Sequence, residues 1–147
     1  MKKFRFPLRS VVTLRRMRES EQREAFAAAV RVCVHAGAAL AQVDKRIASL
    51  EDTIAHERAV HFQALAQVAF LHALEDERIL RKEAAGHLAK TKAAMESAQL
   101  AWLEARRDVR LVEVLETKAR GIHQHELERE EQALLDDRTN ALFARAG

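Results

Sequence analysis

Residues 26–54, FAAAVRVCVHAGAALAQVDKRIASLEDTI, decide the fold, because their apolar positions recur in alternating steps of three and four. These positions are Phe26, Ala29, Cys33, Ala36, Leu40, Val43, Ile47, Leu50 and Ile54. A repeat of this kind lays one apolar stripe along an α-helix, and a stripe sustained over several heptads is typical of a coiled coil. The stretch therefore predicts a long helix that packs against a second one.

A second stripe with the same alternation lies in the C-terminal half of the chain. It consists of Leu88, Thr91, Met95, Ala98, Trp102, Ala105, Val109 and Val112, and it continues at a slightly shifted register through Leu115, Ala119 and Ile122. Between the stripes, from about Ala55 to Val68, the periodicity is lost. We therefore expect an all-α fold, a long antiparallel two-helix coiled coil, with helices over about 7–58 and 68–143, a turn at about 59–67 and one domain over 1–147.

The composition agrees with long helices, because the 147 residues include only 4 Gly and 1 Pro, the main breakers of regular structure. Pro7 is suited to the first turn of a helix, where its missing N–H needs no partner. A sheet is not expected.

A reversal near Leu65 would pair the two stripes layer by layer. The layers would be Phe26 with Ala105, Ala29 with Trp102, Cys33 with Ala98, Ala36 with Met95 and Val43 with Leu88. A reversal half a heptad earlier also gives acceptable layers, so both registers stay open. In the first register residue 4 lies opposite about residue 127, and the segment from Glu128 onward projects past the N-terminus as a single helix.

No residues in the sequence stand at spacings that indicate catalysis. Cys33 falls on the apolar stripe, where a thiol packs as a small hydrophobic group. His123, His125 and Glu126 are not spaced to share one helix face, so a metal site is not expected. A single seam leaves little room for a substrate pocket. We therefore expect no enzyme activity, cofactor, metal or small-molecule substrate, and a soluble cytoplasmic protein without a membrane-spanning helix.

Charge is unevenly distributed along the chain. The N-terminal stretch is basic, with Lys2, Lys3, Arg5, Arg9, Arg15, Arg16, Arg18 and Arg23. It lacks the interleaved aromatic residues of a nucleic-acid site, which is not favoured here. Phe70, Leu71 and Leu74 lie in an acidic neighbourhood just after the expected reversal, and they either close the seam or form an exposed docking patch.

Two stretches resemble a known family. Residues 4–15, FRFPLRSVVTLR, are similar to the opening of the flagellar type III export protein FliJ. Residues 102–109, WLEARRDV, with Leu115 and Glu116 and then 128–138, EREEQALLDDR, resemble that family's closing helix. Length and hairpin layout match over essentially the whole chain.

The resemblance implies a stalk, similar to the coiled coil of the γ subunit of rotary ATPases, that sits in the ring of the export ATPase hexamer. It also implies contact with the cytoplasmic domain of the membrane export gate, a peripheral place at the inner membrane, and the escort of export chaperones. A virulence-secretion stalk, a nucleic-acid-binding coiled coil and a structural homo-oligomer remain open as alternatives.

Two groups of residues are expected to bind these partners. Phe70 and Leu74 match a gate-contacting pair of the family, whereas Glu77 and Arg81 stand where some members have Ala and His. At the other end, Arg15, Arg16 and Arg18, with the projecting tail from Glu128, are expected to contact the ATPase ring.

Overall fold

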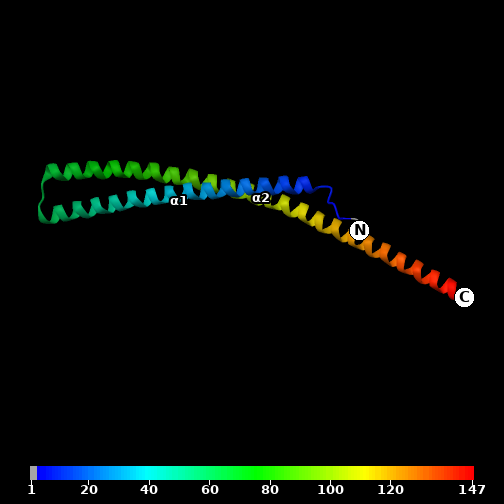
Figure 1. Ribbon diagram of the computed structural model, residues 1–147. Coiled ribbons are helices and arrows are strands. Elements are labelled where there is room, and N and C mark those ends of the chain that lie inside the picture. Colours follow the sequence, from blue (N-terminus) through cyan, green and yellow to red (C-terminus); the bar gives the residue numbers. More distant parts are fainter. Residues whose placement is uncertain (1–2) are drawn as a thin grey trace. The chain divides into compact units, whose positions relative to one another are not determined.

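The computed structural model describes residues 3–147 and contains two helices, α1 (Arg9–Val60) and α2 (Ala64–Ala146) (Figure 1). The chain reverses direction at residues 61–63, and the described residues contain no strand. The helices pack against each other as an antiparallel hairpin. The all-α hairpin predicted from the heptad stripes is therefore confirmed.

The N-terminal end of α1 lies close to Pro7. The Leu8 carbonyl accepts the first helical bond from the Val12 N–H at 3.0 Å, and the Arg9 N–H bonds the Phe6 carbonyl at 3.2 Å. Pro7 thus stands in the turn that leads into the helix. The helix begins at Arg9, two residues after the start that was expected at about residue 7. Helix boundaries commonly vary by this amount.

The reversal needs neither glycine nor proline, and no described residue has a positive φ angle. The His61 N–H still bonds the Glu57 carbonyl at 2.9 Å, and the Gln67 N–H bonds the Gln63 carbonyl at 3.0 Å. Arg58 Nε donates across the reversal to Gln67 Oε1 at 3.0 Å. This bond ties the end of α1 to the start of α2. Both helix ends lie inside the turn expected at 59–67, so the loop itself is shorter than expected.

Both helices run through two compact units. The turn unit comprises Glu21–Trp102, and the terminal unit combines Met1–Ser20 with Leu103–Gly147. Each unit has its own section of the seam, and each is described separately below.

In the turn unit, the first stripe is covered by α2 as predicted. Its buried apolar members are Cys33, Ala36, Val43 and Ile54, joined from α2 by Leu74. Gln67 and Thr91 are also buried in this seam. No large side chain among the described residues is completely buried, as expected for a two-helix packing with one seam.

The register differs from the one with the reversal near Leu65. Phe26 stacks on Trp102 with ring centroids 5.6 Å apart and planes 10° from parallel, so Trp102 does not lie opposite Ala29. Nearer the reversal, a Cβ at Gly37 would lie 3.9 Å from Leu88 Cδ1. The chain reverses at 61–63, before Leu65, and the half-heptad-earlier alternative is therefore the one adopted. It brings two aromatic rings together, which buries more apolar surface than a ring against alanine.

In the terminal unit, Val12 from α1 packs into the seam with Ala105 and Val112 from α2. Beyond Val112 the seam continues in the same register through Glu116, Ala119 and His123, which are half-buried. Leu115 and Ile122 are exposed, so the predicted register shift is wrong.

The N-terminal segment explains why this register persists. The Phe4 ring lies 5.5 Å from the His123 ring, and the Arg120 guanidinium lies 5.5 Å from the centre of the Phe4 ring. Because Phe4 covers the face of α2 that carries His123, the second stripe continues there without a register shift.

One stretch of α1 is apolar enough to cross a membrane by length and composition alone. It is an 18-residue window with mean hydropathy 1.5 and at most two charged residues, and only 17% of it is buried. The expectation that no segment approaches such a composition was therefore too strong. In the hairpin this part of α1 pairs with a section of α2 that carries Lys90 and Lys92, and two lysines are costly inside a bilayer.

Candidate docking surfaces

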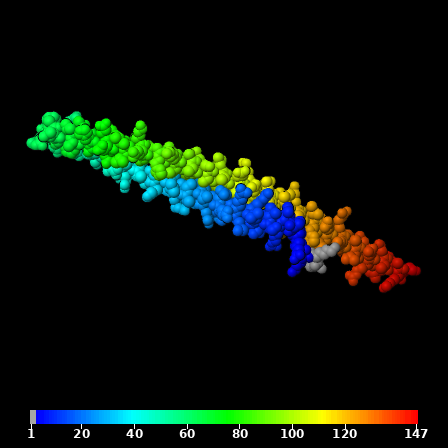
Figure 2. All heavy atoms as spheres, turned by 90° about the horizontal axis from the view of Figure 1, so that it is seen from above, coloured from blue at the N-terminus to red at the C-terminus, as the bar shows by residue number. Residues whose placement is uncertain are grey.

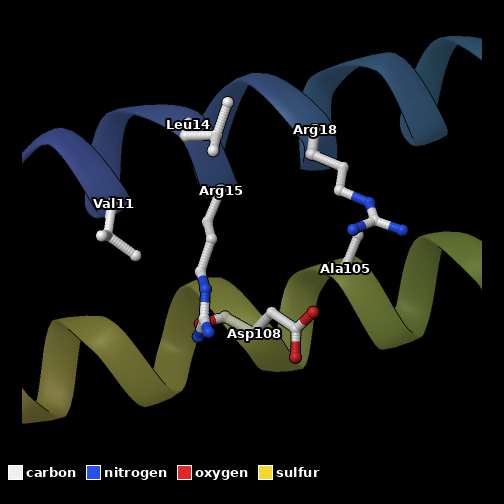
Figure 3. Close-up of a pocket in the computed structure, with 6 residues that line it drawn as sticks. All are labelled: Val11, Leu14, Arg15, Arg18, Ala105 and Asp108. Atoms are coloured by element: carbon white, nitrogen blue, oxygen red, sulfur yellow. The ribbon is translucent and has the colours of Figure 1, made fainter.

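A basic groove crosses the terminal unit between the start of α1 and the middle of α2 (Figure 3). Its volume is about 310 Å³, and its lining residues are Val11, Leu14, Arg15, Arg18, Ala105 and Asp108. The heptad on α1 produces this arrangement, because Val12 points into the seam and its neighbours flank the crossing. The lining combines apolar side chains with two arginines and the carboxylate of Asp108.

The three arginines predicted to bind a ring-shaped partner are not equivalent. Arg15 donates from Nη1 to the Asp108 carbonyl at 3.1 Å, and Arg16 pairs with Glu113 at 3.1 Å. Arg18 is exposed, and it forms no ion pair with any residue that the structure describes. Arg15 and Arg16 thus have partners on α2, whereas Arg18 is available to a partner protein.

A second basic groove on α2 was not anticipated from the sequence. It has a volume of about 320 Å³ and is lined by Leu103, Arg106, Arg107 and Arg110. The signal was present, because residues 103, 106, 107 and 110 follow the spacing of one helix face. The prediction of a basic surface considered only the N-terminal arginines, so it did not include this groove. The cationic surface of the terminal unit therefore includes both helices.

The four residues predicted to contact the gate occupy the seam and its rim in the turn unit. Leu74 is only 6% exposed and Phe70 is half-buried. Glu77 accepts two bonds of 3.1 Å from Arg46 Nε, and Arg81 pairs with Asp44. The exposed Phe70–Leu74 pair that a docking patch required is therefore not present, because Leu74 closes the seam. Binding of a partner through the rest of the set stays a prediction.

The exposed apolar side chains near the reversal are different ones. They are Val60, Phe62, Leu65, Val68 and Leu71, of which Leu65 is 88% exposed. Leu71 belongs to the stretch that the sequence singled out as a possible docking patch, whereas the other four lie in the region where the heptad pattern is lost. They form the apolar surface at this end of the turn unit.

The last part of α2 has no helix against it. Every residue from Glu128 to Gly147 is exposed, and in Figure 2 the red end of α2 carries no other described segment. Leu134, Leu135, Leu142 and Phe143 are the large apolar residues on this tail. A lone helix with exposed leucines is suited to binding a protein partner.

Nothing in the described residues assembles a chemical site. No group of three or more His, Cys, Asp or Glu side chains lies close enough there to hold a metal ion. His123 packs on Phe4, while His125 Nδ1 lies 3.5 Å from Glu128 Oε2, so the two histidines face different neighbours. Cys33 is buried in the seam. The surfaces described above are suited to docking.

Fold and surface together define a class, the helical-hairpin proteins with surface grooves and a free helix end. Over residues 4–147 the sequence matches the family described as Flagellar FliJ protein. The chain therefore belongs to the FliJ family, which implies a component of flagellar type III export. No curated protein and no solved structure matches it significantly.

Proposed function

We propose that the protein is a non-enzymatic stalk of the flagellar type III export apparatus. It links the export ATPase ring to the cytoplasmic domain of the export gate, escorts export chaperones, and works in the cytoplasm at the inner membrane. Family membership over nearly the whole chain supports the export role. The finer assignment depends mainly on one structural observation, the unpartnered tail of α2 beside a cationic surface in the same unit.

In this proposal the terminal unit is the end that enters the ATPase ring. Arg18 and the groove on α2 supply positive charge, and the tail supplies exposed leucines. Charge complementarity of this kind accelerates and orients association, while the buried apolar contacts hold the complex. Hydrolysis belongs to the partner, so the stalk needs no catalytic group of its own.

The turn unit is then the end that meets the gate. Phe70 remains half-exposed, and Leu65 and Phe62 add apolar surface next to the reversal. Glu77 and Arg81 are engaged with α1, so their contribution is to keep the rim in place.

The experiment that tests the ring contact compares two arginines. Arg18→Glu should weaken binding to the purified ATPase hexamer by roughly tenfold, because an unpaired cation is lost and repulsion is added. Arg16→Glu is the matched control, since it breaks an exposed pair with Glu113 that is worth little. Binding is measured by titration at low and high salt, and melting curves verify folding.

The result also decides the role of the tail. Deletion of residues 139–147 should weaken the same complex without changing the melt, because those residues contact no other helix. Unchanged affinity in both the Arg18 variant and the truncated chain would move the ring contact away from the terminal unit.

A further inference from the structure

The middle of the turn unit is a belt without carboxylates. We define the central belt as residues 26–43 of α1 and 84–95 of α2, which lie side by side (Figure 1). Glu83 and Glu96 lie on α2 just outside the two ends of the belt. Neither helix segment of the belt contains Asp or Glu, and the charged residues of the belt are Arg31, Lys90 and Lys92. The belt is thus both apolar and cationic.

Much of this apolar surface is open to solvent. Val34 is 67% exposed and Val32 is 52% exposed, although the window of α1 with mean hydropathy 1.5 has the composition of a buried helix. A helix that is apolar on all sides is usually covered on all sides. In this hairpin α2 covers only one face of the apolar stretch of α1, so the remaining faces are suited to a further helix.

A groove in the belt is shaped for such a helix. It has a volume of about 430 Å³ and is lined by Arg31, Val32, His35, Ala36, Ala39 and His87. Small alanines in its wall allow close approach of a partner backbone. Toward the reversal, ion pairs such as Arg46–Glu77 and Arg78–Glu51 join the two helices, but none does so in the described belt. Arg31, Lys90 and Lys92 are exposed and form no ion pair with the residues that the structure describes, while Glu96 lies one turn beyond Lys92 on the same face of α2.

The tail of α2 has the complementary character. Residues 126–138 contain six carboxylates, Glu126, Glu128, Glu130, Glu131, Asp136 and Asp137, against Arg129 and Arg138. Leu127 and Leu134 are seven residues apart, as are Leu135 and Leu142, so these leucines recur on one side of the helix, where Glu131 and Arg138 lie between them. The tail is therefore an acidic helix with exposed leucines, and no other described helix packs on it.

We propose that the tail of a second copy of this chain docks on the central belt. Its leucines pack against Val32 and the neighbouring alanines, and its carboxylates face Arg31, Lys90 and Lys92. The tail of the same chain would have to break α2, which is one continuous helix from Ala64 to Ala146. The contact joins two different surfaces, so it is heterologous. It goes beyond the stalk role and does not depend on it.

Sedimentation velocity of the full chain provides the first test. Over roughly 5 to 200 µM we expect reversible self-association, and raising salt from about 50 to about 500 mM should weaken it by screening the facing charges. Val32→Glu with Ala39→Glu should raise the dissociation constant at least about tenfold, because a charged side chain is placed in each contact. Leu111→Glu, at an exposed leucine of the terminal unit, is the matched control and should leave association unchanged.

Charge reversal identifies the two surfaces directly. One variant carries Arg31→Glu, Lys90→Glu and Lys92→Glu, and the other carries Glu128→Lys, Glu131→Lys and Asp137→Lys. All six positions are exposed, so circular dichroism should show both variants helical. Each should lose self-association alone, and an equimolar mixture should regain it, because each reversed surface then meets an opposite charge.

Three results would overturn the proposal. They are a chain that sediments as a monomer at every concentration, an association that the belt variants leave unchanged, and a mixture of the reversed variants that does not associate. Monomeric behaviour would assign the belt to an acidic helix of another protein.

Discussion

Trp102 shows how one side chain selects between two registers that the heptads allow. Its ring lies nearly parallel to Phe26, although both residues remain partly exposed. An aromatic pair contributes free energy beyond the area that it buries, on the order of 1 kcal/mol. An alanine layer opposite tryptophan offers no such term. The stack therefore favours the register with the earlier reversal.

A double-mutant cycle tests this interpretation. Trp102→Leu and Phe26→Leu should each lower the free energy of unfolding by about 1–2 kcal/mol, and their coupling energy should be about 1 kcal/mol. Urea denaturation followed by circular dichroism gives the three differences. The pair Trp102→Leu and Ala29→Val is the control, and a larger coupling there would restore the later register.

Gln67 is a second residue whose surroundings determine its effect on stability. It is 5% exposed in the seam, its Oε1 accepts from Arg58, and its Nε2 is buried without a hydrogen-bond partner. An unsatisfied buried amide costs about 1–3 kcal/mol. Gln67→Leu removes that cost and adds apolar packing.

We therefore expect Gln67→Leu to melt at the same temperature as the natural chain or above it. Arg58→Ala should melt lower, because it leaves the Gln67 oxygen without its donor. A clear loss of stability in Gln67→Leu would show that the bond across the reversal outweighs the unsatisfied nitrogen.

At the scale of the element, neighbouring residues on one face of α2 are buried to different depths. Phe70 and Leu74 are four residues apart and share that face, but the seam takes Leu74 fully and Phe70 only in part. Leu74 therefore serves packing, and Phe70 keeps part of its ring exposed for the proposed gate contact.

The two residues should respond differently to truncation. Leu74→Ala should cost about 2–4 kcal/mol of unfolding free energy, within the range of buried leucines. Phe70→Ala should change the melt less and weaken binding to the purified cytoplasmic domain of the gate. Leu71→Ala, at an exposed position beside both, is the stability control. Normal gate binding by a folded Phe70→Ala chain would remove Phe70 from the gate contact.

At the scale of the whole molecule, the two units share both helices but have separate cores. The turn unit contains the reversal, the Phe26–Trp102 stack and the ion pairs Arg46–Glu77, Arg78–Glu51 and Arg81–Asp44. The terminal unit depends on Val12, Ala105 and Val112 and on the N-terminal segment around Phe4. The turn unit therefore contains the contacts that its own hairpin needs.

A fragment of residues 21–102 should accordingly fold alone. We expect a helical circular dichroism spectrum and a cooperative melt, at a lower temperature than the full chain because less seam is buried. A fragment of residues 1–82 is the control, since it keeps α1 but loses the section of α2 that covers Cys33 and Ala36. Equal helicity in the two fragments would contradict a seam-dependent core.

The sequence by itself determined the helices and the stripe that each buries, because a heptad is a local pattern and Gly and Pro are scarce. It also indicated the family and the lone tail after Glu128, since both depend on the order of residues. What the sequence left open concerns alignment, namely the choice between two registers and whether Leu74 closes the seam or is exposed. The predicted register shift beyond Val112 is wrong. All three depend on where the chain reverses.

Only the tertiary structure decided that alignment. A half-heptad slip exchanges one set of apolar layers for another of similar quality, so the stripes alone leave two nearly equal solutions. The contacts between the helices separate them, through the aromatic stack and the bond from Arg58 to Gln67. The same alignment determines which charges are paired. Arg16 meets Glu113, while Arg18 meets no acidic partner among the residues that the structure describes, because the spacing of facing side chains is fixed only once the helices are side by side.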